Sequence, residues 1–238
     1  MRFGIINDIH SNITALKLVM DRLDLMGCDR IICCGDIIGI GPWPEETVRY
    51  MMQIPNLIAV RGNHDRYLLE GMPDDMGPSE KEHHRWEHRQ LSEKSVSFLK
   101  SLPYRTDFDC EGLRISVMHW PMDNKGNFIR HARCHTEKDL EDLFADEDSD
   151  IILFAHDHRR IICRGKRLYV DVGSLGCPGN DGNIARAGVL TIENGKAGIE
   201  TFDVIYDAAS VVGTIDSLGY PDADFIREYF FGVSGKGE

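Results

Sequence analysis

Short apolar runs that end in aspartate, asparagine or histidine recur along this 238-residue chain. Runs of this kind are typical of buried strands. The polar residues that follow them, or stand between them, can all bind metal through oxygen or imidazole nitrogen: Asp8, His10, Asp36, Asn63, His119, His156 and His158. Ligands at the ends of several parallel strands converge on one crevice. The pattern therefore predicts an α/β fold with a site that could hold two cations.

The first part of the chain alternates between strand and helix patterns. A strand is predicted over residues 2–7, and Ser11 or Asn12 caps a helix whose apolar residues keep helical spacing as far as Gly27. The alternation continues as strand, helix and strand over residues 30–34, 44–53 and 57–60. This βαβαβ order implies a parallel sheet with right-handed crossovers.

The alternation stops beyond residue 70. Residues 71–90 are predicted as a polar insertion that could cap the site, and a helix is expected over residues 92–101. Further strands are expected over residues 104–107, 113–118, 151–154, 161–163, 167–172, 188–192 and 198–205. Their close spacing predicts a second, more antiparallel sheet packed against the first. Residues 207–238 are predicted as a C-terminal helical tail without an interpretable motif.

Composition limits the partners and the cellular setting. No linker or repeat divides the chain, so residues 1–238 are expected to form a single domain. With 27 Lys and Arg against 39 Asp and Glu, the net charge of −12 disfavours long nucleic acid as a partner. No apolar run approaches the ~20 residues of a membrane span. Seven cysteines without a Cys-x-x-Cys pair suit a reduced, cytoplasmic setting. Composition leaves the oligomeric state open.

The order and spacing of the polar motifs resemble the calcineurin-like metallophosphoesterase superfamily. The motifs are Asp8-Ile9-His10, Gly35-Asp36, Gly62-Asn63-His64-Asp65, the single His119, and His156-Asp157-His158. The stretch from Gly35 to Glu46 is similar to the small prokaryotic branch that contains phosphodiesterases and diadenosine-tetraphosphatase-like proteins. The resemblance runs from Phe3 to about Ile192. It implies a two-sheet β-sandwich flanked by helices and a dinuclear, metal-dependent phosphoesterase.

The resemblance also implies how the ligands are divided. It assigns Asp8, His10 and His158 to one cation and Asn63, His119 and His156 to the other, with Asp36 as the bridge. A ligand set without cysteine favours manganese first, with iron, nickel, cobalt or zinc as alternatives. Two such cations ~3.5–4 Å apart would lower the pKa of a bridging water, so that a bridging hydroxide attacks phosphorus.

Other residues are predicted to contact the substrate. The family resemblance makes His64 a general acid or transition-state stabiliser, and Asp65 would orient its ring and raise its basicity. Arg61 is a candidate phosphate clamp, because guanidinium matches phosphate oxygens in a bidentate way. Gly173 and Ser174 fall where the family usually has an Asn-Pro-Gly-Ser turn, although Asp171 and Val172 depart from that pattern.

Several aromatic and histidine residues have two interpretations. His84 and His88 are four residues apart and could share a metal on a helix, although a solvated helix face is preferred; His131 and His135 have the same spacing and the same preference. Trp86 and Trp120 could stack a nucleobase above the site, or simply pack.

The predicted substrate is a small phosphodiester or phosphomonoester. A nucleotide-polyphosphate or phosphoprotein phosphatase is the main enzymatic alternative, and a non-catalytic metal-binding scaffold is the alternative from another class. The presence of every expected ligand together with His64 argues against the scaffold.

Overall fold

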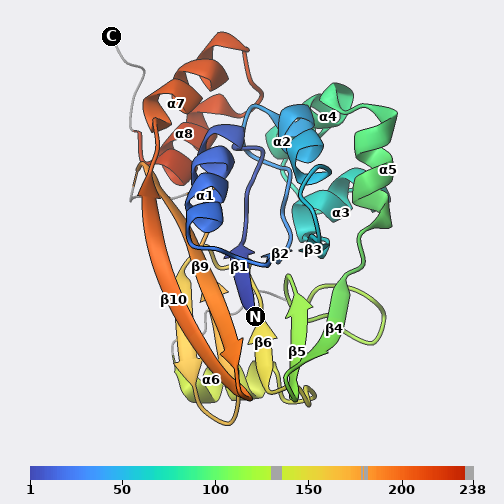
Figure 1. Ribbon diagram of the computed structural model, residues 1–238. Coiled ribbons are helices and arrows are strands. Elements are labelled where there is room, and N and C mark those ends of the chain that lie inside the picture. Colours follow the sequence, from blue (N-terminus) through green and yellow to red (C-terminus); the bar gives the residue numbers. More distant parts are fainter. Residues whose placement is uncertain (130–135, 178, 180–181, 234–238) are drawn as a thin grey trace.

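Two five-stranded sheets pack face to face in the computed structural model, which describes residues 1–129, 136–177, 179 and 182–233 (Figure 1). The first sheet contains β1 (Arg2–Ile6), β2 (Arg30–Cys33), β3 (Ile58–Ala59), β9 (Ile184–Glu193) and β10 (Lys196–Ile205). The second contains β4 (Arg105–Cys110), β5 (Leu113–Met118), β6 (Ile151–Leu153), β7 (Arg160–Arg164) and β8 (Leu168–Val172). The strand orders are β10-β9-β1-β2-β3 and β4-β5-β6-β8-β7.

Helices cover the outer faces of the sandwich (Figure 1). They are α1 (Ile13–Leu25), α2 (Pro44–Met51), α3 (Asn63–Glu70), α4 (Pro78–Gln90), α5 (Glu93–Ser101), α6 (Glu137–Leu143), α7 (Ala208–Ser217) and α8 (Ala223–Phe231). The predicted two-sheet sandwich flanked by helices is therefore confirmed. Within the described residues, no helix is both long enough and apolar enough to cross a membrane.

Three buried apolar clusters correspond to the interfaces between the layers. One joins the first sheet to its helices, one lies between the two sheets, and one joins the second sheet to α6. Side chains alternate between the two faces of a strand, so one strand can contribute to two clusters. In β6, Ile151 and Leu153 face the first sheet, whereas Ile152 faces α6. Strands that are buried on both faces consist of continuous apolar runs, because neither face is exposed to water. Such runs are present in this sequence.

The first helix begins and ends as its sequence predicts. Asn12 is the N-cap of α1, and its side chain accepts a hydrogen bond from the backbone N–H of Ala15 (3.1 Å). Gly27 follows the helix with a positive φ of 67°, a conformation that glycine adopts without steric cost.

One sequence expectation about the elements is wrong. The strands β9 and β10 complete the first sheet, so both sheets are equally mixed: each has two parallel and two antiparallel pairings. The polar stretch over residues 71–90 contains a regular helix, α4, from Pro78 onward. The histidines His131 and His135 lie outside the described residues.

Candidate metal centre

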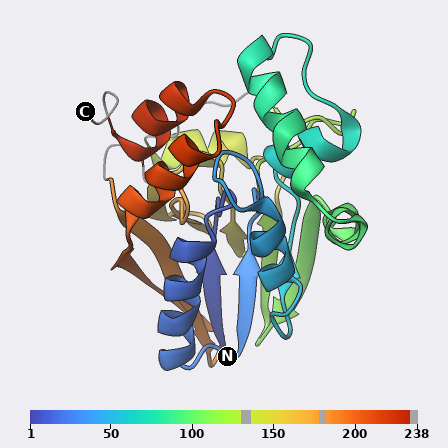
Figure 2. The same cartoon turned by 90° about the horizontal axis from the view of Figure 1, so that it is seen from above.

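All seven candidate ligands lie at one edge of the sandwich. Each stands just beyond the carboxyl end of a strand: Asp8 and His10 after β1, Asp36 after β2, Asn63 after β3, His119 after β5, and His156 and His158 after β6. The parallel pairings β1–β2–β3 and β5–β6–β8 bring these ends together from both sheets. Figure 2 shows the loops after β1 and β2 lying between α7 and α8 on one side and α3 and α4 on the other.

The seven candidate ligands form two compact groups, here called the metal groups, and a third set within the same distance limit adds His64 to His10 and Asp36. In one group, the ligand atoms of Asp8, His10 and His158 lie within 4.8 Å of one another, and 3.0 Å separates the two Nε2 atoms of His10 and His158. In the other group, Asp36, His119 and His156 satisfy the same limit, with 3.2 Å between His119 Nε2 and His156 Nδ1. The amide oxygen of Asn63 lies 2.9 Å from His119 Nε2 and extends this second group.

The carboxylate of Asp36 lies between the two groups. Its Oδ2 atom is 3.8 Å from His10 Nε2 and 3.3 Å from His119 Nε2. Its Oδ1 atom accepts a hydrogen bond from the backbone N–H of His64 (2.9 Å), which fixes the orientation of the carboxylate. One side chain is therefore shared by both groups, as a bridging ligand requires.

Backbone carbonyls orient the two most buried imidazoles. The Nδ1 atom of His10 lies 3.2 Å from the carbonyl oxygen of Ile38, and Nδ1 of His119 lies 2.9 Å from that of Cys34. A carbonyl can only accept, so in both rings Nδ1 carries the hydrogen. The Nε2 lone pairs then point into the ligand cluster, as metal-binding histidines require.

The buried carboxylates of the site are unfavourable in their charged form when no cation is bound. Burial raises the pKa of Asp8 well above its ordinary value, and the neighbouring Asp171 raises it further. Burial likewise raises the pKa of Asp36, with Asp65 adding to the shift. One oxygen of Asp8, Oδ2, is buried and has no hydrogen-bond partner. A divalent cation would stabilise these crowded carboxylates, so the donor set fits a metal.

The backbone of the ligands is strained as well. Five of them have a positive φ, which side chains other than glycine rarely adopt: Asp8 (49°), His10 (47°), Asp36 (52°), His156 (87°) and His158 (58°). Such conformations cost about 1–3 kcal/mol each and cluster at functional sites. Hydrogen bonds between neighbouring loops hold them, including those from His10 N–H to Asp36 O (3.0 Å) and from Asp8 N–H to Gly35 O (3.2 Å).

Gly62 allows the closest approach to the shared carboxylate. A Cβ atom at Gly62 would lie 2.1 Å from Asp36 Oδ1, too close for any real contact. We expect Gly62→Ala to displace the Asp36 carboxylate and lower the metal content of the purified protein, measured by elemental analysis. Gly77→Ala is the matched control, because a Cβ there meets nothing within 4 Å. Equal metal content in the two variants would contradict this account.

His64 lies beside the metal groups, but Asp65 does not orient its ring. The ring packs edge-on against His10 (5.0 Å between centroids). The carboxylate of Asp65 instead accepts hydrogen bonds from the backbone N–H groups of Ile37, Ile38 and Gly62. The predicted role of Asp65 is therefore wrong: it fixes the loop after β2. Burial, followed by the neighbouring histidines, lowers the pKa of His64 well below its ordinary value.

Arg61 is engaged by the protein and does not point to the metal groups. Its guanidinium is nearly buried and donates hydrogen bonds to the Glu70 carboxylate (3.0 Å), the Tyr104 hydroxyl (3.3 Å), and the carbonyls of Lys100 (2.8 Å) and Leu102 (3.0 Å). These partners engage both terminal nitrogens of the guanidinium, and the remaining donor, Nε, is buried. The structure thus contradicts the predicted phosphate clamp.

Gly173 and Ser174 also use their N–H groups internally. The N–H of Gly173 donates to Asp171 Oδ1 (2.8 Å), and that of Ser174 donates to the carbonyl of His158 (3.2 Å). The Ser174 hydroxyl donates to the carbonyl of Asp8 (2.9 Å). These residues hold two candidate ligands in place, which corrects the prediction that they bind substrate.

Helix α4 contributes a buried polar face that the sequence did not reveal. His83, His84 and Glu87 are 3%, 4% and 1% exposed, whereas His88 is exposed. The Glu87 carboxylate accepts hydrogen bonds from the Ser11 hydroxyl (2.8 Å) and the N–H of Gly39 (2.5 Å). Both the predicted solvated face and the alternative metal pair of His84 and His88 are wrong. Instead, α4 supports the loops after β1 and β2.

Trp86 and Trp120 both pack against other side chains of the protein. Trp120 is 2% exposed and lies in the apolar cluster beneath α6. Trp86 is half-buried, with its ring 4.5 Å from that of Tyr220. Packing, and not stacking above the site, is the interpretation that the structure supports.

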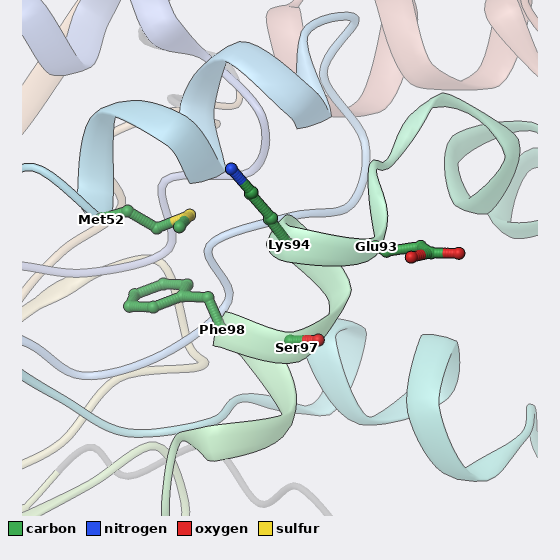
Figure 3. Close-up of a pocket in the computed structure, with 5 residues that line it drawn as sticks. All are labelled: Met52, Glu93, Lys94, Ser97 and Phe98. Carbon is green, nitrogen blue, oxygen red and sulfur yellow. The ribbon is translucent and has the colours of Figure 1, made fainter.

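A pocket of about 510 Å³ lies away from the metal groups (Figure 3). It is formed at the end of α2 and along α5 by Met52, Glu93, Lys94, Ser97 and Phe98. None of the candidate ligands lines this pocket, so it is separate from the metal centre.

Comparison with known proteins agrees with this geometry. A sequence profile described as the calcineurin-like phosphoesterase superfamily domain matches residues 1–195. An uncharacterised protein of Methanocaldococcus jannaschii is 26% identical over 222 residues, covering 86% of this chain and 87% of that protein. A symmetrical bis(5'-nucleosyl)-tetraphosphatase of Pseudomonas fluorescens is 35% identical over 66 residues, which cover 27% of this chain and 23% of that protein.

The fold is also similar to that of a solved structure. The crystal structure of a metallophosphoesterase from Sphaerobacter thermophilus matches with a TM-score of 0.78 and 24% identity, covering 98% of this chain and 99% of that one. The matching domain profile spans most of the sequence, from β1 to β9, and includes every candidate ligand. The chain therefore belongs to the calcineurin-like phosphoesterase superfamily and is a metal-dependent phosphoesterase.

Proposed function

We propose that the protein hydrolyses a small phosphodiester or phosphomonoester at a dinuclear metal centre. The observation that carries this proposal is the position of Asp36, whose carboxylate oxygen lies within 3.8 Å of one imidazole group and 3.3 Å of the other. Two bound divalent cations supply Lewis-acid activation of water and of the phosphoryl oxygens. No side chain of the protein is then needed as a nucleophile.

The protein residues divide into two ligand sets. Asp8, His10 and His158 are proposed to hold one cation, and Asn63, His119 and His156 the other, with Asp36 common to both. The donors are carboxylate, amide and imidazole groups without a thiolate, which favours manganese, with iron, nickel, cobalt or zinc as alternatives.

His64 is proposed as the residue that acts on the substrate. Its ring contacts His10, and its backbone N–H is bonded to Asp36, so it is positioned by two candidate ligands. Its Nδ1 atom is buried against Gly39 and has no hydrogen-bond partner. The residue is nevertheless partly exposed, and one ring nitrogen lies within 4.8 Å of the ligand atoms of His10 and Asp36. The ring can therefore reach a phosphoryl oxygen held there or donate a proton to the leaving oxygen, the role of a general acid.

The proposed centre predicts two cations per chain. After reconstitution with manganese and desalting, elemental analysis should approach two ions per protein, because two separate ligand groups share one carboxylate. His158→Ala, which removes a ligand from one group only, should lower the value toward one. A wild-type stoichiometry that stays at one or below would contradict a dinuclear centre.

A panel of phosphoesters tests the substrate class. The manganese-loaded protein would be assayed with a phosphodiester, a phosphomonoester, a dinucleoside tetraphosphate and a phosphopeptide under matched conditions. The dinucleoside tetraphosphate is included because the match to a bis(5'-nucleosyl)-tetraphosphatase covers 27% of the chain. Faster turnover of the phosphodiester or phosphomonoester than of the dinucleoside tetraphosphate and the phosphopeptide supports the proposal. If a protein with two bound cations turns over none of the four, a non-catalytic scaffold is favoured.

A further inference from the structure

Helix α8 exposes two aromatic side chains to solvent. Phe225 is 52% exposed and Tyr229 is 62% exposed. They are the two exposed aromatic residues in the part of the chain that the structure describes. Burial of such side chains in a partner or ligand would be favourable, so their position relative to the metal centre matters.

The aromatic side chains of α8 form an ordered cluster. Phe225 and Tyr229 are one helical turn apart, and their rings stack with 5.2 Å between centroids and an interplanar angle of 12°. Both rings meet Phe230 in edge-on contacts, at 6.0 Å and 5.0 Å between centroids. We name these three residues, Phe225, Tyr229 and Phe230, the aromatic platform.

The aromatic platform is continuous with the metal centre. The ring of Phe230 lies 6.2 Å from that of His158, which is one of the candidate ligands. The side chain of His158 is 25% exposed, whereas those of Asp8 and His10 are fully buried. The ligand cluster therefore opens to solvent at His158, next to Phe230.

The helix that carries the platform is fixed to the site loops. The Tyr220 hydroxyl lies 2.7 Å from the carbonyl oxygen of Ile40 and 2.6 Å from that of Gly41, in the loop that follows Asp36. Asp222, the N-cap of α8, accepts a hydrogen bond from the Ser79 hydroxyl of α4 (2.7 Å). The aromatic platform is therefore held at a defined place relative to the ligands. Figure 2 shows α7 and α8 beside the loops after β1 and β2.

We propose that the aromatic platform binds a flat organic group of the phosphoester substrate, such as a nucleobase, while the phosphoryl group is held at the metal centre. This inference rests on the function proposed above. Bases stack on aromatic side chains with little regard to their identity. The same helix exposes the carboxylates Asp224 and Glu228, which suit a neutral base better than an anionic polymer.

The test compares two esters that share a leaving group. One is the nitrophenyl ester of thymidine 5'-phosphate and the other is methyl nitrophenyl phosphate, so they differ only in the second esterified group, which is thymidine in one and methyl in the other. In Phe225→Ala/Tyr229→Ala, we expect kcat/KM for the nucleoside ester to fall roughly tenfold more than for the methyl ester, mainly through KM. Leu218→Ala, which removes an exposed apolar side chain at the end of α7, should leave kcat/KM unchanged for both esters.

A conservative variant separates stacking from folding. Phe225→Trp/Tyr229→Phe retains flat rings and should keep the preference for the nucleoside ester, whereas the alanine variant should lose it. Circular dichroism of all variants checks the fold. Equal losses for both esters, or no loss for either, would overturn the proposal.

A binding measurement distinguishes failure of this inference from failure of the proposed function. Adenosine 5'-monophosphate would be titrated calorimetrically into the manganese-loaded wild type and the alanine variant. Weaker binding in the variant supports the platform even if the wild type hydrolyses neither ester, and unchanged binding overturns it. A wild-type dimer that dissociates in the alanine variant, seen by light scattering, would show that a second copy covers these residues and would also overturn the proposal.

Discussion

Replacement of Asp36 by asparagine is expected to remove both cations and to abolish turnover. The two side chains have the same shape, and an asparagine oxygen can still accept the hydrogen bond from the N–H of His64. The variant should therefore fold. What it loses is the negative charge of an oxygen that lies between the Nε2 atoms of His10 and His119. Loss of that charge weakens both ligand groups at once.

The measurement pairs metal analysis with activity. In Asp36→Asn the metal content should fall below one ion per chain and hydrolysis should fall to background, even at excess manganese. In His158→Ala, the control, the loss should be confined mainly to one ion. Mild and equal effects in the two variants would show that Asp36 is not shared between the cations.

Replacement of His64 by alanine is expected to reduce turnover by roughly 10²–10⁴-fold while both cations stay bound. The ring of His64 lies at the edge of the metal groups, and the contact of its residue with Asp36 is made by the backbone, which alanine retains. A residue that donates a proton matters most when the leaving oxygen is basic. The loss should therefore be smaller for a nitrophenyl ester, whose leaving group needs little protonation.

The control for this variant is His88→Ala, on the exposed face of α4. It should leave metal content and turnover unchanged. If His64→Ala lowers turnover equally for the nitrophenyl ester and for an ester with a basic leaving oxygen, the ring acts on the phosphoryl oxygens. Loss of a cation would mean that His64 is itself a ligand, because its ring nitrogen lies within 4.8 Å of the ligand atoms of His10 and Asp36.

The sequence predicted the strands and the gathering of the ligands because both depend on local patterns. Apolar runs marked the strands to within a few residues, and β5 was predicted at its observed bounds, Leu113–Met118. The carboxyl ends of parallel strands share an edge, so polar residues at those ends had to meet. The division of the ligands between two cations, implied by the family resemblance, stays a prediction that the metal analyses above would test.

Hydrogen-bond partners far apart in the sequence could not be predicted in this way. Arg61 is bonded to the carbonyls of Lys100 and Leu102, about forty residues away, and no local pattern indicates this. The buried face of α4 was missed for a related reason. Its inward residues are His83, His84 and Glu87, and a periodicity search looks for apolar side chains. The one available signal was the placement of Glu87 three residues after His84.

The positive φ angles of five candidate ligands have a consequence for which ions the protein can accept. A loop held in a costly conformation by neighbouring hydrogen bonds cannot expand without losing the bonds that stabilise it. Calcium needs six to eight oxygen ligands at about 2.3–2.6 Å in flexible geometry. Four of the seven candidate ligands are imidazoles, which offer nitrogen, so the candidate site cannot supply such a shell. The fixed loops and the imidazole donors together disfavour calcium, so we expect excess calcium to leave manganese bound at the proposed centre.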